Sequence, residues 1–282
     1  MAVKIVTDST ADLPKEIVEE LGIRVVPLNV HFGEEVFLDW VELTPEGFFE
    51  KLAGTDLLPR TSQPSPGDFQ KVYEELGSGG DAIVSVHISQ VLSGTYQSAT
   101  MARDLLEGMD ITVIDSKVAS MALGLTVMEA ARAAKAGKSK EEILEIIDFY
   151  MQETRVLFMV DTLEYLEKNG RIGKAQALLG GLLKMKPILS LKDGGIIPVE
   201  KARGSKKALQ TIVERLQEML PPDRKVKGTI VHGNALATAE ALAEDLKKTY
   251  DLSELIITSV GAVIGCHTGP GLVGLLFFPD KE

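Results

Sequence analysis

The sequence predicts an α/β protein: a three-layer α/β/α domain on a parallel sheet, followed by an α+β domain with a mostly antiparallel sheet. Two observations support this. Over about the first 160 residues, short apolar runs alternate with helical segments, as in βαβ units. Further on, Asp193-Gly194-Gly195 separates two apolar runs, as in the turn of an antiparallel hairpin. We therefore expect one domain over residues 1–160 and a second over residues 161–282.

Helix-start signals order the first domain. Thr44-Pro45 and Ser65-Pro66 each place a capping residue before a proline, and Ser139 with Glu142 forms a capping box. Ser93 is expected to cap a further helix. The expected strands are residues 4–8, 25–32, 82–88 and 111–115, and the expected helices are 11–21, 44–53, 65 onward, 94–106, 119–136 and 139–153.

The second domain has a different order of elements. Two helical pieces come first, then the hairpin, and then helices and strands in alternation. The expected helices are residues 163–168, 175–183, 205–220 and 235–250, and the expected strands are 187–191, 196–201, 228–232 and 255–259.

Composition excludes several classes of protein. The 282 residues are 45% hydrophobic and carry a net charge of −11, so a nucleic-acid partner is not expected. The only cysteine, Cys266, cannot form an internal disulfide. The N-terminal residues resemble a strand and not a signal peptide, and no apolar run is long enough to span a membrane. We expect a cytoplasmic protein without stable membrane insertion.

The segment from Gly261 to Gly274 is unusual because five of its fourteen residues are glycine. Such density indicates close access to the backbone. His267 and Thr268 lie within it, beside the apolar run 272–278, which suggests a site for a ligand with one polar end. The segment formally matches G-x-G-x-x-G, but no helix and second strand can follow, so dinucleotide binding is not expected. If the segment is a strand, Cys266 and His267 point to opposite faces and cannot form a catalytic pair.

Hydroxyl-rich segments suggest a carboxylate site. One contains Thr61 and Ser62 and another contains Ser93, and each lies just before an expected helix. Free N–H groups at helix starts favour an anion, which these hydroxyls and the imidazole of His267 could also bind. The alternative is that Ser93 is only a helix cap. Residues 7–14 contain two aspartates, which could hold a metal ion. A turn with a helix cap is the favoured interpretation, and we expect no metal.

Five motifs occur in a fixed order along the chain. They are Thr7-Asp-Ser-Thr-Ala-Asp-Leu-Pro14, Thr61-Ser-Gln-Pro64, Leu92-Ser-Gly-Thr-Tyr96, Gly170-Arg-Ile172 and Gly265-Cys-His-Thr-Gly-Pro-Gly271. Together they resemble the DegV family of bacterial fatty-acid-binding proteins. The resemblance implies that the chain has no cofactor, binds a long-chain fatty acid and presents its carboxylate to a separate ATP-dependent kinase subunit. The resulting acyl phosphate would feed phospholipid synthesis. The chain itself would not be an enzyme.

The resemblance also implies roles for residues. Thr61, Ser93 and His267 would hold the carboxylate, with Ser62, Gly94 and Thr268 as neighbours. Arg171 and Arg203 would contact the kinase or the head group of the fatty acid. Burial of a long acyl tail favours an aliphatic tunnel, whose candidate wall residues are Met121, Leu125, Leu179, Leu182 and Ile188.

Two other functions remain open. One is a stand-alone small-molecule kinase or transferase, although the sequence shows no Walker motif. The other is a carrier of a different anionic lipid.

Overall fold

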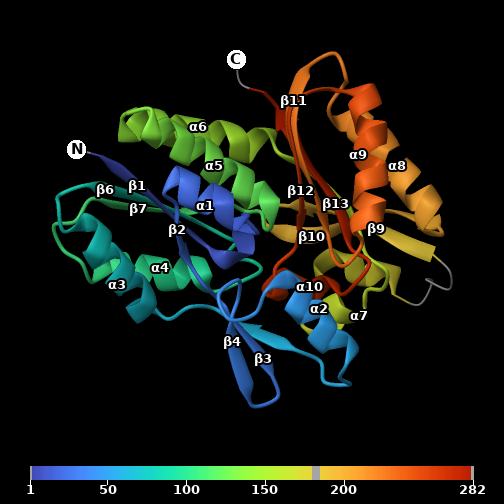
Figure 1. Ribbon diagram of the computed structural model, residues 1–282, viewed down its shortest axis with the longest axis horizontal. Coiled ribbons are helices and arrows are strands. Elements are labelled where there is room, and N and C mark those ends of the chain that lie inside the picture. The colour runs from blue at the N-terminus through green and yellow to red at the C-terminus, as the bar shows by residue number, and fades with distance from the viewer. Residues whose placement is uncertain (1, 180–184, 281–282) are drawn as a thin grey trace.

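A parallel sheet organises the N-terminal part of the computed structural model, which describes residues 2–179 and 185–280 (Figure 1). Its four strands lie in the order β2-β1-β6-β7, and all neighbouring pairs are parallel. The strands are β1 (Val3–Asp8), β2 (Arg24–Val26), β6 (Ala82–His87) and β7 (Ile111–Asp115). The expected parallel sheet is therefore confirmed.

Helices cover both faces of this sheet. On one face, α5 (Met121–Lys135) packs against β1 and β6, with α1 (Lys15–Leu21) and α6 (Lys140–Glu153) beside it. On the other face lie α3 (Pro66–Gly77) and α4 (Thr95–Asp104). The three-layer prediction is confirmed.

The expected caps form at three helices. The hydroxyl of Thr44 accepts a hydrogen bond from the Gly47 amide at the start of α2 (Pro45–Ala53), and Ser65 and Ser139 form capping boxes at α3 and α6. By contrast, the sequence predicts Ser93 as the cap of α4 (Thr95–Asp104), but the N-cap of this helix is Gly94.

A second sheet of six strands forms the C-terminal part, in the order β10-β9-β8-β13-β11-β12. All neighbouring pairs are antiparallel except β11 with β12. Helices α8 (Ser205–Met219) and α9 (Leu236–Thr249) pack on its outer face. The strands are β8 (Arg155–Met159), β9 (Met185–Lys192), β10 (Gly195–Arg203), β11 (Lys225–His232), β12 (Asp251–Ser259) and β13 (Val273–Pro279).

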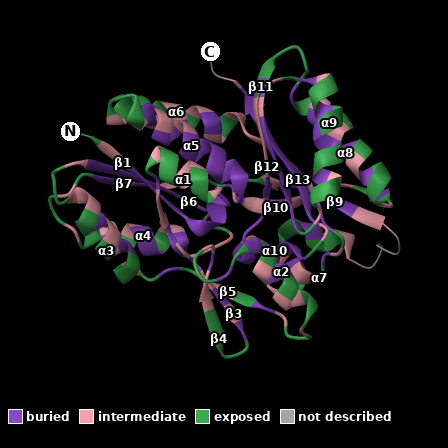
Figure 2. Cartoon of the chain, in the orientation of Figure 1, coloured by how far each residue is buried: buried purple, intermediate pink, exposed green. Residues whose placement is uncertain are grey.

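One hydrophobic cluster contains residues of both parts. Helix α5 packs against β1 and β6 on one side and against β11 and β13 on the other, and most of its residues are buried (Figure 2). The expected hairpin at 193–195 joins β9 and β10. Strand β8 belongs to the second sheet although it precedes residue 160, and the division of the chain at that residue stays a prediction.

A small third sheet corrects the expected strand at 25–32. The chain changes sheets at Pro27, which cannot donate a backbone hydrogen bond, and the Leu28 amide bonds instead to Ser9 Oγ at 3.1 Å. Residues beyond it form β3 (Asn29–Phe32), which pairs with β4 (Glu35–Leu38) and β5 (Arg60–Ser62). The short partner strands carried no clear alternating pattern in the sequence.

One of the two helical pieces expected before the hairpin differs from expectation. Residues Gly173–Leu178 form a 3-10 helix in place of the start of the helix expected at 175–183, whose end lies outside the described residues. The helix expected at 163–168 is present as α7 (Glu164–Lys168).

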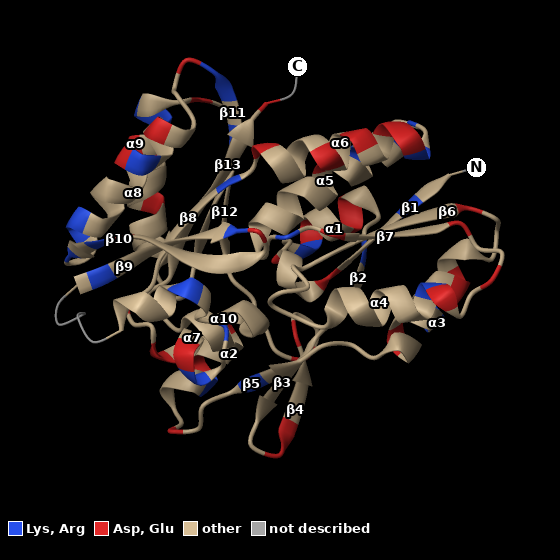
Figure 3. Ribbon diagram, turned by 180° about the vertical axis from the view of Figure 1, so that it is seen from behind, with Lys and Arg blue, Asp and Glu red and all other residues tan. Residues whose placement is uncertain are grey.

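Lys and Arg residues gather where β9 and β10 lie beside the start of α8 (Figure 3). Acidic residues predominate on α6, whereas α9 carries both acidic and basic residues (Figure 3). Among the described residues, no helix combines the length and the apolar character needed to cross a bilayer.

Candidate functional site

A cavity of about 890 Å³, including its opening, lies between the carboxyl edge of the parallel sheet and the inner face of the second sheet. Loops that follow β6 and precede α5 form one wall, which includes Ile88, Leu92 and Ser120. Strands of the second sheet form the opposite wall. The carboxyl edge of a parallel sheet is the usual place for a ligand in such folds.

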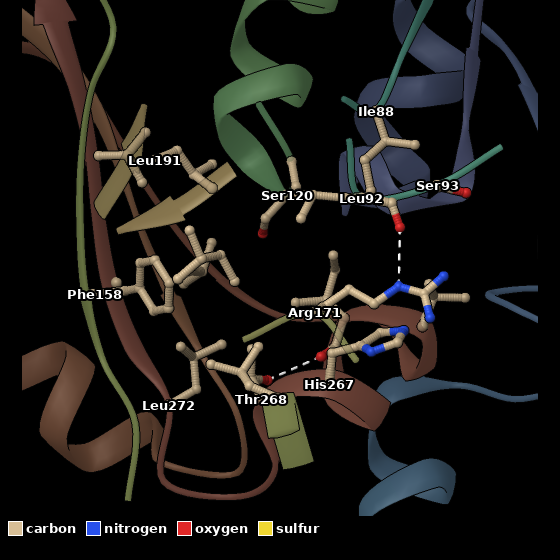
Figure 4. Close-up of a pocket in the computed structure, with 18 of the residues that line it drawn as sticks. Ile88, Leu92, Ser93, Ser120, Phe158, Arg171, Leu191, His267, Thr268 and Leu272 are labelled. Atoms are coloured by element: carbon tan, nitrogen blue, oxygen red, sulfur yellow. Dashed lines mark hydrogen bonds between the residues drawn. The ribbon is translucent and has the colours of Figure 1, made fainter. Parts of the chain in front are cut away.

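Polar side chains gather at one end of the cavity. Thr61 Oγ1 lies 2.9 Å from His267 Nε2, which joins β5 to a helix 206 residues away in the sequence. Ser93 Oγ shares a hydrogen bond of 2.9 Å with the Thr95 hydroxyl. Arg171 donates from Nε to the Leu92 carbonyl at 3.0 Å and from an Nη group to the Asn169 carbonyl at 2.8 Å. Figure 4 shows Arg171 and His267 side by side.

Strand alternation separates Thr61 from Ser62. Neighbouring residues of a strand point to opposite faces, and Ser62 Oγ bonds to His31 Nε2 at 2.9 Å, outside the cavity lining. The sequence placed Thr61 only in a segment before a helix. In the structure, Thr61 belongs to β5 and reaches the cavity from the third sheet. Gly94 adjoins Ser93 but packs against Gln63 and does not line the cavity.

His267 lies on a helix and not on a strand. The segment forms α10 (Ala262–Thr268) and not the strand that was considered for it in the sequence. Cys266 is completely buried on this helix, whereas His267 faces the cavity. The hydroxyl of Thr268 lines the cavity but donates to the Ile264 carbonyl at 2.9 Å.

The glycines of this segment admit neighbouring side chains. A Cβ atom at Gly265 would overlap the ring of Phe48, and one at Gly269 would overlap the ring of Tyr165. Gly269 also has a φ of 71°, in the left-handed region that favours glycine. The close access that the sequence indicated therefore serves aromatic packing around α10.

Two buried carboxyl groups hold the start of α10. Asp12 accepts from the Gly261 amide at 2.8 Å and from Ser120 Oγ at 2.5 Å, and Asp39 accepts from the Ala262 amide at 2.8 Å. Burial is the main reason that the pKa of Asp12 rises to about 8 and that of Asp39 to about 7. These contacts fix the helix that carries His267.

Electrostatics make the polar end receptive to an anion. Burial, assisted by the charge of Arg171, lowers the pKa of His267 to about 4, so the imidazole is neutral at pH 7. Its Nδ1 atom is buried without a hydrogen-bond partner among the described residues. Within the same ranges, no carboxylate forms an ion pair with Arg171.

Apolar residues form most of the rest of the cavity lining, in which Ser120 donates its hydroxyl proton to Asp12. In Figure 4, Phe158, Leu191 and Leu272 lie on the side away from Arg171 and His267. The apolar run noted at 272–278 supplies Leu272, Gly274 and Leu276 to the lining. Further apolar lining residues that sequence reasoning missed are Leu28, Ile88, Ala119, Val156, Leu157, Phe158, Leu166, Leu191, Ile196, Val231, Val263 and Ile264.

The expected tunnel residues lie elsewhere. Met121 and Leu125 are completely buried on α5, and Ile188 packs in the core on the other side of the second sheet. Leu179 is partly buried outside the lining, and Leu182 lies outside the described residues. All are apolar, as a tunnel wall requires, but apolar character alone does not distinguish a cavity wall from ordinary core.

Two other expectations concern polar residues away from the cavity lining. Arg203 is exposed at the end of β10. Residues 7–14 form the expected turn, in which Asp8 accepts from the Thr10 amide at 3.1 Å. Across residues 2–179 and 185–280, no three histidine, cysteine or acidic side chains are grouped as a metal site would require.

Comparisons with known proteins match this fold along its whole length. A family model described as "Uncharacterised protein, DegV family" matches residues 2–280. A DegV domain-containing protein of Halalkalibacterium halodurans is 40% identical over 280 residues, covering 99% of each chain.

Solved structures agree with the sequence matches. A fatty-acid-binding DegV family protein from Thermus thermophilus is 38% identical, with a TM-score of 0.92 over 99% of this chain and 100% of that one. A stearic-acid-binding protein from Eubacterium ventriosum is 30% identical, with a TM-score of 0.90 over 98% of each chain. The chain described here belongs to the DegV family.

Proposed function

We propose that this protein binds one long-chain fatty acid, with the carboxylate at the polar end of the cavity and the acyl chain along its apolar walls. The observation that carries this proposal is the Thr61–His267 pair, which lies with Ser93 and Arg171 at one end of a mostly apolar cavity. The two solved relatives described above also bind fatty acids.

The hydrogen bonds at the polar end suit a carboxylate acceptor. A neutral His267 that carries its proton on Nε2 donates to Thr61, which leaves the Thr61 hydroxyl proton for the ligand. Ser93 can donate in the same way when it accepts from Thr95. Arg171 supplies positive charge. A buried carboxylate needs several such donors, because burial without partners is costly.

The apolar walls suit an acyl chain. Each methylene group that leaves water contributes about 0.8 kcal/mol. The walls are mainly aliphatic, with Phe158 as the aromatic member of the lining. A fatty acid matches this combination of one anionic end and a long apolar body.

We further propose that the protein presents the carboxylate to a separate ATP-dependent kinase in the cytoplasm. Thr61 and Ser93 are only partly buried and Gln63 is exposed, so the polar end lies near the surface. A carboxylate oxygen would attack the γ-phosphorus of ATP on the kinase, with ADP as the leaving group, and the acyl phosphate would enter phospholipid synthesis. The exposed Arg203 would contact the kinase.

Mass spectrometry of a solvent extract of the purified protein tests the binding proposal. We expect a stoichiometric long-chain fatty acid, or saturable binding of an added one. A different anionic lipid in the spectrum, or neither bound nor added fatty acid, would overturn it. Calorimetric binding of ATP to the isolated protein would instead support a stand-alone kinase.

An assay of acyl phosphate formation with the kinase tests the second part. We expect the His267→Ala variant to fold, as shown by circular dichroism, and to support much slower turnover than the wild type. Unchanged turnover would exclude the proposed role of His267.

A further inference from the structure

We infer that Gly274 sets the length of acyl chain that the cavity accepts. This inference rests on the proposed fatty-acid binding and adds a specificity-determining residue to it. Gly274 lies on β13 between Val231 of β11 and Phe158 of β8, its direct partners in the two neighbouring strands. All three residues line the cavity.

Gly274 is the exception on the sheet side of the cavity. The other residues that present side chains from the second sheet are branched or aromatic, namely Val156, Phe158, Leu191, Ile196, Val231 and Leu276. At Gly274 the backbone itself forms the wall. Glycine inside a strand is destabilising and usually marks a close approach of another group. At Gly274 these groups are the Val231 side chain and, under the proposed function, the bound acyl chain.

A side chain at this position would reduce the cavity. A Cβ atom on Gly274 would lie 2.9 Å from Val231 Cγ2 and 3.3 Å from Phe158 Cβ. The first distance is too short for carbon atoms in contact, so Val231 would have to move. Because both neighbours also line the cavity, the added methyl group or the displaced side chain must occupy space that is now open.

The position of Gly274 relates this space to chain length. The head group lies at Thr61 and His267, and Phe158, the partner of Gly274, lies on the side of the cavity away from His267 (Figure 4). The distal part of a long chain therefore passes Gly274, whereas a short chain ends before it.

Affinities for lauric, myristic, palmitic and stearic acids, measured for the wild type and the Gly274→Ala variant, test this inference. We expect the variant to lose affinity for stearic acid more than for lauric acid. Each methylene group that can no longer be buried costs about fourfold in affinity, so two such groups lower the ratio of stearic to lauric affinity by about fifteenfold.

Gly228→Ala is the matched control. Gly228 is also a strand glycine of the same sheet, and a Cβ atom there would lie 2.5 Å from Phe277 Cε1, within the core and not in the cavity lining. We expect this variant to lower the melting temperature without changing the ratio of affinities.

Two further variants separate a local steric effect from general damage to the sheet. Adding Val231→Ala to Gly274→Ala removes the nearest atom and should restore the affinity for stearic acid. Val231→Leu adds volume at the same place and leaves residue 274 unchanged. It should reproduce the selective loss of affinity for stearic acid even if Gly274→Ala does not fold.

The outcomes distinguish the inference from the proposal beneath it. If the wild type binds none of the four acids, fatty-acid binding itself is wrong. If the wild type binds them but Gly274→Ala weakens all four equally, as does Val231→Leu, Gly274 does not determine chain length.

Discussion

The hydroxyl of Thr61 offers the most direct test of the polar end. The Thr61→Val substitution removes Oγ1 and keeps the shape of the side chain. In the wild type, Oγ1 lies 2.9 Å from His267 Nε2, and its proton is available for a carboxylate when the imidazole donates from Nε2. A hydrogen bond to a charged group contributes about 1.5–3 kcal/mol. We therefore expect the affinity for palmitic acid to fall by roughly 10- to 150-fold.

Isothermal titration of delipidated protein measures this change, and Ser62→Ala is its matched control. Ser62 is the next residue of β5, but it bonds to His31 and lies outside the cavity lining. We expect Ser62→Ala to bind palmitic acid nearly as well as the wild type, and Thr61→Ser to retain most of the affinity. The reasoning fails if Thr61→Val binds as tightly as the wild type, or if Ser62→Ala is equally impaired at a similar melting temperature.

Three other outcomes follow from the contacts around the cavity. Arg171→Gln removes the positive charge beside His267, and titration should show binding of palmitic acid weakened by about tenfold or more. The pKa of Asp12 is about 8 in the folded protein against an ordinary value of 3.8, so Asp12 contributes stability that is lost as pH rises from about 4 through 8. In urea unfolding, the free energy of unfolding of Asp12→Asn should therefore fall less over this pH range than that of the wild type. An equal fall in both proteins would argue against a protonated Asp12. Gly265→Ala places a methyl group against the Phe48 ring and should lower the free energy of unfolding by about 1–3 kcal/mol in the same assay, whereas an unchanged value would mean that the ring moves freely.

Local features of the sequence predicted local features of the fold. The caps at Thr44, Ser65 and Ser139 need only residues three positions away, and each forms as expected. The hairpin at 193–195 likewise depends on its own turn residues. These predictions succeed because the interactions that decide them lie within a few residues.

Distant contacts decided what the sequence could not show. Helix α10 forms in a glycine-rich segment because Asp12 and Asp39 hold its first amides and the Phe48 ring packs against Gly265. None of these partners is near the helix in the sequence, and glycine by itself disfavours helix. The helix could therefore not be predicted from the segment alone.

The site was predictable at its polar end and not along its walls. Thr61, Ser93, Arg171 and His267 belong to motifs that resemble those of the family, and the structure brings them to one cavity. The wall depends on which face of the second sheet points inward, which is set by pairing between strands that are far apart in the sequence. Leucines such as Leu125 and Leu191 therefore look equivalent in the sequence, although only Leu191 lines the cavity.

The cavity has its walls on both halves of the fold, with Ile88 and Leu92 on one side and Phe158 and Leu191 on the other. An acyl chain held there would pack between the two halves as part of the hydrophobic core. Binding to the folded state alone adds about 2.7 kcal/mol of stability at a free ligand concentration 100 times the Kd. The protein with a bound acyl chain would then resist heat and proteases better than the protein without one. Proteases would therefore degrade the unliganded form first.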